Sequence, residues 1–267
     1  MKSVNQLMNL EGKCAVITGA GGKIGYEVAL AIAELGGDLI LIDFPGTDYT
    51  KLQNTIKLLG QRTVKTFDCD LENTDERSGL ISKLLAENLP INILINNAGF
   101  VGTTDLEGWV TDFQNQSIET WRRAVEVNLT ACFDLSKGLM QKIKNSGDGS
   151  IINISSIYGF LAPDYSLYES TSMGNPAAYA ASKGGLIQLS KWMSTTLAPD
   201  IRVNTISPGG VFRNQPKEFI KRYENKTPLG RMATEEDLKG AIIFLASNLS
   251  SYVTGHNLIV DGGWSSW

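Results

Sequence analysis

Short runs of apolar residues recur along the chain, and the segments between them carry apolar residues at helical spacing. The runs are continuously apolar rather than alternating, as expected for strands buried on both faces of a parallel sheet. They are the candidate strands: CAVIT (14–18), DLILID (38–43), TVKTFD (63–68), INILIN (91–96), SIINIS (150–155), IRVNTI (201–206) and NLIVD (257–261).

Helical patterns lie between these runs. From 24 to 35, four apolar residues fall on one helix face, and the glycines at 36–37 end the segment. Thr234 in TEED is a candidate helix cap. Repeated β–α alternation predicts right-handed crossovers and helices on both sheet faces, a doubly wound α/β fold. No linker or repeat interrupts 1–267, so we expect one domain.

Two connections are long, one at about 100–119 and the other at about 157–175. Loops of this length inside a compact domain are usually functional or disordered. Both carry aromatic residues, which argues against disorder. We expect both segments to fold over the carboxyl edge of the sheet as a substrate enclosure, with packing against a neighbouring subunit as the alternative for 157–175.

Composition excludes several classes of function. The chain has 267 residues, 42% hydrophobic and 19% charged, with a net charge of -4 and no basic run, which argues against a nucleic-acid partner. No apolar stretch is long enough to span a membrane, and the N-terminus lacks a signal-peptide core. Three scattered cysteines indicate buried thiols in a reducing cytoplasm. With His256 as the single histidine, we expect no metal site.

A glycine-rich turn, TGAGGKIG at 18–25, connects the first strand to the first long helix. In that context Gly19 permits a tight turn, Gly21 or Gly22 permits close backbone approach, and Gly25 permits close packing of helix on strand. The helix N-terminus offers free N–H groups to a pyrophosphate. The turn therefore predicts a dinucleotide site, with an ordinary β–α turn as the alternative.

An acidic residue at the end of the second strand supports the cofactor interpretation. Asp43 lies 18 residues after Gly25, where a carboxylate can accept hydrogen bonds from both hydroxyls of an adenosine ribose. The same carboxylate would repel the 2′-phosphate of NADP. A turn or capping aspartate is the alternative.

Further motifs follow in order: DCDL (68–71), NNAG (96–99), Asn128 in VEVNL, INISS (152–156), YAASK (179–183), SPGG (207–210) and VDGG (260–263). Together with the glycine turn, they make nearly the whole chain resemble the classical short-chain dehydrogenase/reductases (SDR). The resemblance implies a single Rossmann-type domain with a sheet of seven parallel strands. It also implies a homo-oligomer, commonly a tetramer, with a dimer as the smaller possibility.

The turn departs from the family pattern TGxxxGxG at one position, where Lys23 replaces the middle glycine. NADP-preferring members often carry a basic residue one position earlier, at the place of Gly22 here. We expect the two glycines before Lys23 to supply the flexibility and Lys23 to begin the helix with its stem turned outward. Its ammonium would then approach a phosphate only from the side.

The chemical centre is predicted at Tyr179 and Lys183, which are four residues apart on one helix face. A nearby ammonium and a positively charged nicotinamide would lower the phenol pKa and make Tyr179 a general base. Ser156 ends the fifth strand and can hold the substrate oxygen. Asn128 matches the family asparagine of a water-linked proton path. Taken singly, each position has an ordinary structural explanation, such as a solvated helix face or a turn residue.

The resemblance assigns further positions to the cofactor: Ile24 in the glycine turn, Asp70 and Leu71 by the adenine pocket, Asn97, Ala98 and Gly99 beneath the nicotinamide ribose, and Pro208, Gly209 and Val211 beside the nicotinamide amide. Lys183 can also hold the nicotinamide ribose. A structural role for Asn97, bracing the central strands, is equally open.

These observations predict an NAD-dependent oxidoreductase that interconverts a secondary alcohol and a ketone. The alternatives are an NADP-dependent ketoreductase and a dinucleotide-binding regulator without turnover. Ser156 and Tyr179 are 23 positions apart, farther than is usual in the family. The added residues are rich in polar and aromatic side chains, which favours a sugar-like or polyol substrate, and Tyr165, Tyr168 and Glu169 are expected to contact it. The chain also faintly resembles dehydrogenases of surface-sugar and flagellin-modification pathways.

Overall fold

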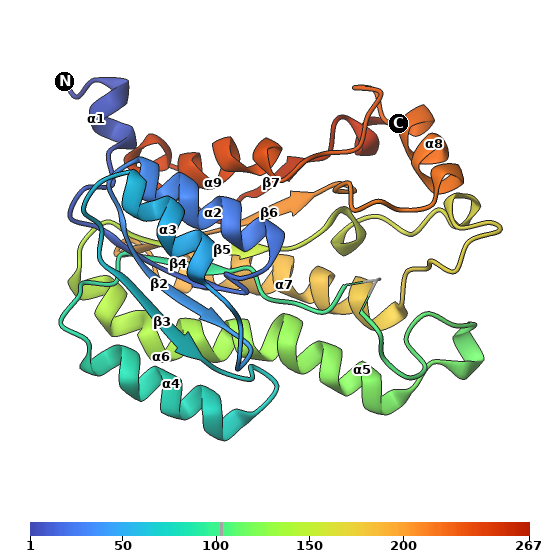
Figure 1. The fold of residues 1–267 in the computed structure, drawn as a ribbon, viewed down its shortest axis with the longest axis horizontal. Helices are drawn as coiled ribbons and strands as arrows, with labels where there is room; N and C mark the ends of the chain where they lie inside the picture. The colour runs from blue at the N-terminus through green and yellow to red at the C-terminus, as the bar shows by residue number, and fades with distance from the viewer. Residues whose placement is uncertain (102–103) are drawn as a thin grey trace.

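Seven parallel strands form one sheet in the computed structural model, which describes residues 1–101 and 104–267. The strands are β1 (Cys14–Thr18), β2 (Asp38–Asp43), β3 (Val64–Asp68), β4 (Ile93–Asn96), β5 (Gly149–Ile154), β6 (Ile201–Pro208) and β7 (Asn257–Val260). Each lies in one of the predicted apolar runs or overlaps it within two residues at either end, so the α/β prediction is confirmed. The order is β3-β2-β1-β4-β5-β6-β7 (Figure 1).

Helices cover both faces of this sheet (Figure 1). On one face, α2 (Lys23–Glu34), α3 (Thr50–Leu58) and α9 (Lys239–Ala246) contribute to one core cluster. On the other face, α4 (Thr74–Ala86), α6 (Ala131–Asn145) and α7 (Ala177–Thr196) contribute to a second cluster. The remaining helices are α1 (Val4–Met8), α5 (Ile118–Val125) and α8 (Lys217–Lys226).

The strand β1 shows why its run is continuously apolar. All five of its residues are buried. Ala15 and Ile17 belong to the core cluster on the α2 face, whereas Cys14 and Val16 belong to the cluster on the α4 face. Since both faces of a central strand are covered, no position favours a polar residue.

The sheet also fixes where a ligand can bind. β1 pairs with β2 on one side and with β4 on the other, so the strand order reverses at β1. In open α/β sheets, ligands bind outside the carboxyl ends of the strands at such a reversal. The glycine turn follows β1 and the NNAG motif overlaps the end of β4, so both lie at this point.

The predicted helix ends agree with the structure in one case and differ in another. Helix α2 spans 23–34 against the predicted 24–35, and Gly36 behind it has φ +97. Thr234, in contrast, is not a side-chain cap: the turn before α9 is a 3-10 helix, Glu236–Leu238, without a side-chain cap bond. Thr234 instead donates from its backbone N to the Asp237 carboxylate at 2.7 Å.

The two long segments contact each other. In the first, residues 102–103 of the predicted 100–119 stretch lie outside the described residues, and Trp109 is buried. The second contains two 3-10 turns, Ile157–Gly159 and Tyr165–Leu167. A Cβ on Gly174 would lie 2.8 Å from Val110 Cγ1, so the two segments are closely packed there, and the backbone N of Ala177, just after the second segment, donates to Gln116 Oε1 of the first at 3.0 Å.

No helix in the described part of the chain has both the length and the apolar character needed to cross a membrane. The three cysteines, Cys14, Cys69 and Cys132, are buried free thiols. Burial raises the pKa of Cys14 to about 12 and the pKa of each of the other two to about 11, so all three are protonated at neutral pH. The described residues contain no cluster of three or more metal-ligating side chains.

Candidate active site

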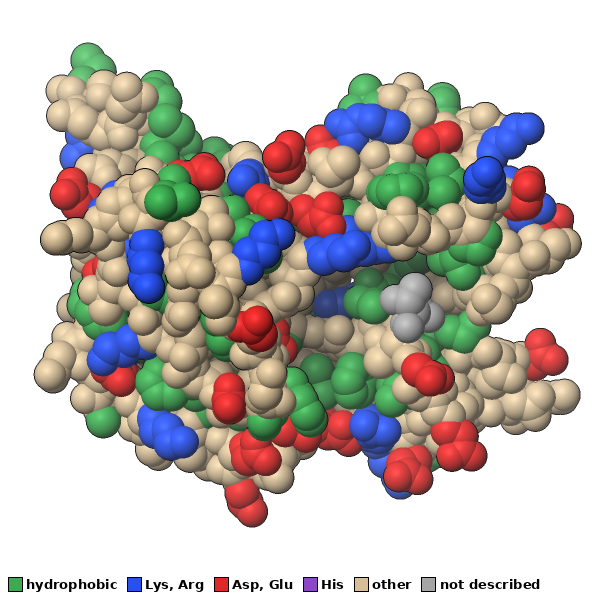
Figure 2. All heavy atoms as spheres, in the orientation of Figure 1, with side chains coloured by type: hydrophobic (Ala, Val, Ile, Leu, Met, Phe, Trp, Pro, Cys, Tyr) green, Lys and Arg blue, Asp and Glu red, His purple; other side chains and the backbone are tan. Residues whose placement is uncertain are grey.

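Two adjoining cavities open at the carboxyl edge of the sheet. A cleft of about 680 Å³ runs along the glycine turn and the end of β2, and a cavity of about 450 Å³ lies over Ser156 and Tyr179. They share lining residues, among them Asn97, Gly99 and Arg213, so one elongated ligand could occupy both. Figure 2 shows the hollow on this face, with Lys or Arg side chains at its rim.

Glycine is required in the turn for steric reasons. A Cβ on Gly19, which has φ +65, would lie 2.9 Å from Ala98 Cα, and one on Gly25 would lie 2.1 Å from Gly19 O. A Cβ on Gly21 would lie 2.3 Å from the Thr47 side chain. The turn and the N-terminus of α2 line the cleft. The cap residue of α2 is Gly22, so no side chain caps the first N–H groups of the helix. The N–H groups there suit a pyrophosphate.

Asp43 is part of the same unit. Its Oδ2 accepts a hydrogen bond from Gly21 N at 2.8 Å, and its Oδ1 accepts one from Phe44 N at 2.8 Å. A carboxylate has about four acceptor positions, so two remain for other donors. The carboxylate lines the cleft beside the turn and can accept from the hydroxyls of a ribose there.

Lys23 is the first residue of α2, and its side chain is exposed, in agreement with the expected outward stem. It lines the cleft together with its neighbour Ile24. A cation at this place adds to the partial positive charge of the helix N-terminus and favours an anion in the cleft.

Asn97 makes the contacts expected for a structural role, which the sequence left open beside a role in cofactor binding. Its Nδ2 donates to Thr18 O and to Gly19 O, both at 3.0 Å. Thr18 Oγ1 in turn accepts from the backbone N of Asn97 and of Ala98, both at 3.1 Å. These bonds tie the end of β4 to the glycine turn, and Asn97 also lines both cavities.

The other proposed cofactor positions divide between the two cavities. Asp70, Leu71 and Ala98 line the cleft, Gly99 lines both, and Pro208, Gly209 and Val211 line the cavity over Tyr179. Gly25 lines neither of them, because it is buried against Gly19. Its place in the predicted site is therefore to allow close packing beneath the turn.

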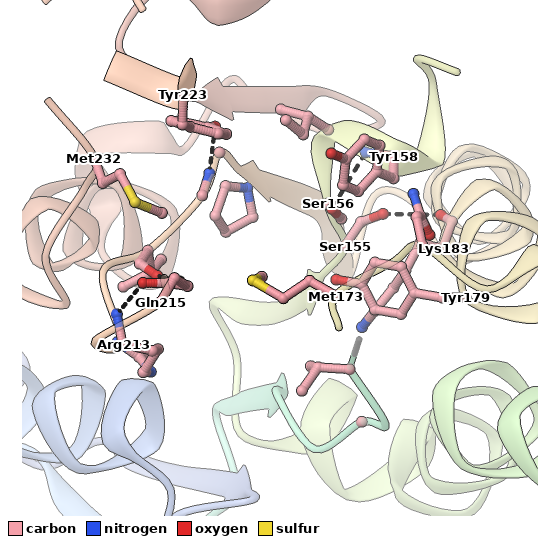
Figure 3. A pocket seen from close by; sticks show the side chains of 18 of the residues that line it. Ser155, Ser156, Tyr158, Met173, Tyr179, Lys183, Arg213, Gln215, Tyr223 and Met232 are labelled. Atoms are coloured by element: carbon pink, nitrogen blue, oxygen red, sulfur yellow. Dashed lines mark hydrogen bonds between the residues drawn. The ribbon is translucent and has the colours of Figure 1, made fainter. Parts of the chain in front are cut away.

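Tyr179 and Lys183 lie one turn apart in α7, and Ser156 follows β5; all three line the same cavity (Figure 3). Asn128 lies directly behind them. A Cβ built on Gly99 would be 3.0 Å from Asn128 Oδ1 and 3.3 Å from Lys183 Nζ, so both side chains lie close to this glycine. The four residues predicted for catalysis are therefore brought together.

The Lys183 ammonium is buried with one direct backbone partner. It is 4% exposed, and Nζ donates to Ile154 O at 2.8 Å. Ser155 Oγ donates to Lys183 O at 2.8 Å, which holds this turn of α7 against the end of β5. Burial lowers the pKa of Lys183 to about 8, because the charged form loses hydration.

The Tyr179 hydroxyl differs from the expectation. Its pKa is raised by burial, and only the neighbouring Ser156 side chain acts in the opposite direction. The ammonium that was expected to lower the pKa of Tyr179 is directed at Ile154 O, with Nζ 6.0 Å from the centre of the tyrosine ring. The protein groups alone therefore keep Tyr179 neutral and able to donate a proton.

Asn128 is fully buried in a π-helical turn, Glu126–Thr130, between α5 and α6. Its Oδ1 accepts from Phe100 N at 2.7 Å, and its Nδ2 donates to Phe100 O at 3.2 Å and to Ser182 Oγ at 3.1 Å. Such π turns are frequent at functional sites. The side chain is thus fully used in positioning, which leaves only its backbone for a proton path.

Sequence reasoning missed the wall opposite Tyr179. It comes from the segment after β6, from α8 and from the segment that follows α8, and it consists of Gly210, Arg213, Gln215, Phe219, Tyr223 and Met232 (Figure 3). Tyr223 Oη accepts from Gly210 N at 2.5 Å, and its ring stacks on Trp264 with centroids 4.4 Å apart. The apolar spacing of Phe219, Ile220 and Tyr223 is the signal in the sequence that predicts an amphipathic helix here.

Of the three residues expected to contact the substrate from the 157–175 segment, only Tyr168 lines the cavity. Tyr158 and Tyr168 line the cavity, and their hydroxyls are hydrogen-bonded at 2.7 Å. Tyr165 is 63% exposed and lies outside this lining, as does Glu169. Asp164 forms an ion pair with Lys226 of α8, so the segment is fastened to that helix.

Comparison with known proteins agrees with this geometry. The family model described as enoyl-(acyl carrier protein) reductase matches residues 19–265. The chain is 34% identical to 2-dehydro-3-deoxy-D-gluconate 5-dehydrogenase of Bacillus subtilis (strain 168) over 280 residues, covering 100% of both chains.

Two solved structures are also similar. A short chain dehydrogenase from Leptospira borgpetersenii with bound NAD+ is 35% identical, has a TM-score of 0.83, and is matched over 99% of this chain and 96% of that one. A gluconate 5-dehydrogenase from Burkholderia cenocepacia in complex with NADP and tartrate is 28% identical, has a TM-score of 0.85, and is matched over 99% and 100%.

Proposed function

The chain belongs to the classical short-chain dehydrogenase/reductase family, and on that premise we propose that it is an NAD-dependent oxidoreductase interconverting a secondary alcohol and a ketone. One observation carries the proposal. Ser156, Tyr179 and Lys183 converge on a single cavity, which adjoins a cleft built around a glycine turn at a helix N-terminus.

The residues along the cleft fit a dinucleotide. Gly19, Gly21 and Gly25 leave no room for a Cβ, the N–H groups of α2 suit the pyrophosphate, and the Asp43 carboxylate suits a ribose. Lys183 would hold the nicotinamide ribose at the other end. The cofactor, when bound, would supply the hydride exchange with the reacting carbon.

The side chains divide the proton chemistry. Ser156 holds the substrate oxygen and stabilises the charge that develops on it. Tyr179 accepts the hydroxyl proton during oxidation and returns it to the ketone oxygen during reduction. Since burial raises the pKa of Tyr179, the protein favours the neutral phenol, which is the form needed for reduction. Oxidation requires positive charge near the phenolate, which a reoriented Lys183 ammonium can contribute.

The preference for NAD rests on Asp43. A 2′-phosphate placed on the ribose at this carboxylate would meet a like charge, and like charges brought together cost binding energy. An NADP-dependent ketoreductase is the second candidate. It is favoured by Lys23 at the mouth of the cleft and by the NADP bound to the similar gluconate 5-dehydrogenase.

A sugar-like or polyol substrate is supported by the cavity and by the relatives. Tyr158, Tyr168, Asn175, Arg213 and Gln215 line the cavity beside its apolar residues, so its wall includes side chains that can form hydrogen bonds. The similar Bacillus subtilis protein acts on a gluconate derivative. The long segments at 100–119 and 157–175 would enclose this substrate.

We further propose a homo-oligomer. Large apolar side chains remain exposed on the outer surface of three neighbouring helices, namely Trp121 of α5, Phe133 of α6 and Trp192 of α7. Light scattering would test the assembly, and a monomer at micromolar concentration would contradict it.

The activity itself is tested by incubating purified protein with NAD or NADP and a panel of polyols and sugar acids, with D-gluconate among them, and with NADH or NADPH and the corresponding ketones. Formation of reduced nicotinamide with at least one alcohol is the expected result, and the Tyr179→Phe variant should show almost none. Binding of NAD without turnover of any alcohol or ketone would instead favour the regulator without catalysis.

A further inference from the structure

The amide of Asn175 is buried without a hydrogen-bond partner. The residue is 7% exposed, and neither Nδ2 nor Oδ1 has a partner among the described residues. Buried side-chain amides are nearly always paired, and an unpaired one is unfavourable, so it calls for an explanation. The same residue lines the cavity over Tyr179.

Asn175 is distinct among the unpaired groups. The others in the described chain are Tyr49 Oη, Asn96 Oδ1 and Thr205 Oγ1. None of these three residues lines the cavity, and the Asn96 side chain is half satisfied through its Nδ2 bond to Asn153 at 2.8 Å. Among the described residues, Asn175 alone combines an entirely unpaired amide with a place in the cavity lining.

Helix capping does not account for this asparagine. Asn favours helix starts because its side chain can accept from the first N–H groups. Here the cap residue of α7 is Pro176, without a side-chain cap bond, and the N–H of Ala177 is taken by Gln116 at 3.0 Å. Asn175 therefore stands at a helix start without capping the helix.

The surroundings hold this amide in place. Met173, Gly174 and Asn175 line the cavity together. A Cβ on Gly174 would lie 2.8 Å from Val110 Cγ1, so these residues pack closely against the other long segment. Tyr179 N donates to Pro176 O at 3.1 Å, which fixes Asn175 beside the turn that carries the catalytic phenol (Figure 3 shows Met173 next to Tyr179).

We propose that Asn175 is a specificity-determining residue that hydrogen-bonds a hydroxyl group on the carbon next to the reacting carbon of the substrate. An amide donates and accepts at once, and a hydroxyl group does the same, so the two satisfy each other. The inference rests on the proposed function and deepens it, because it assigns the enzyme to vicinal diols, the class to which polyols and sugar derivatives belong.

The test compares wild-type protein with Asn175→Leu, which keeps a similar volume and removes the polar atoms, on two alcohols, 2,3-butanediol and 2-butanol. We expect kcat/KM for the diol to fall at least about tenfold more than kcat/KM for the mono-alcohol. An equal loss on both alcohols would overturn the inference.

Thermal unfolding of the free protein provides the second readout. If the amide is unpaired, removing it leaves the Tm equal or higher by a few degrees, whereas a structural amide would give a lower Tm and contradict the proposal. Asn175→Ala replaces the leucine variant if overpacking prevents folding. Wild-type protein that oxidises neither these two alcohols nor any polyol of the panel speaks against the proposed function; in that case a lower Tm of the variant still overturns the inference, and an equal or higher Tm supports only its premise that the amide is unpaired.

Discussion

Replacement of Lys183 by methionine should stabilise the free protein while it abolishes turnover. Burial lowers the Lys183 pKa from its ordinary 10.5 to about 8. One pH unit of such a difference corresponds to about 1.4 kcal/mol, so holding the ammonium charged at pH 7 costs about 3 kcal/mol of folding stability. Methionine fills a similar volume without that charge.

The gain is reduced by one lost interaction. Nζ donates to Ile154 O at 2.8 Å, and a net hydrogen bond of this kind contributes about 1 kcal/mol. The net expectation is a stabilisation of about 2 kcal/mol, which raises the Tm by about 5 °C in a protein of this size. Lys191→Met, at an exposed position of the same helix, is the matched control and should leave the Tm unchanged.

The sign of the pH dependence makes the test specific. Between about pH 8 and pH 10.5 the unfolded chain keeps the Lys183 proton that the folded protein has lost, so the stability of wild type rises with pH in that window. The advantage of Lys183→Met must therefore shrink as the pH rises from 7 to 10. Denaturation curves at both pH values measure it, and a gain that is absent at pH 7, or the same at both, would refute the reasoning.

Three further outcomes are expected. Tyr179→Phe should lower kcat at least about 10²-fold. Because the pKa of Tyr179 is raised, the oxidation rate of wild type should increase with pH, and the variant should lose this increase. An increase retained in the variant would show that another group is the base. Asp43→Asn should shift the ratio of kcat/KM with NAD to that with NADP at least about tenfold towards NADP, whereas Asp48→Asn, outside the cleft, should not. Gly25→Ala should destabilise by about 2 kcal/mol, because its Cβ meets Gly19 O, whereas Gly240→Ala, with open space around it, should stabilise by up to about 1 kcal/mol; equal Tm changes would contradict this contrast.

The strands were predictable because burial on both faces leaves a strong local signal. β1 and β2 agree with the predicted runs at both ends. The weakest burial occurs at the edge strand β3, whose residues are mostly half-buried or exposed. Sequence order also predicted which residues meet at the carboxyl edge, since parallel strands bring their ends to one side.

The lining of the cavity was less predictable. A loop has no periodicity, so nothing in 157–175 indicates that Tyr168 faces inward while Tyr165 is exposed. The wall from α8 depends on how a helix far along the chain packs, here through the Asp164–Lys226 ion pair and the stacked rings of Tyr223 and Trp264. Nor does spacing reveal that the Lys183 ammonium points to Ile154 O rather than to the phenol.

The end of β4 couples the two halves of the site. Asn97 holds the glycine turn through Thr18 O and Gly19 O, and two residues later Gly99 lies against both Asn128 and Lys183. A displacement of this short segment would move the cofactor turn and the catalytic lysine together. Changes at 97–99 should therefore impair cofactor binding and chemistry as one effect. Changes in α8, which lines the cavity over Tyr179 but not the cleft, should instead alter substrate choice and leave cofactor affinity intact.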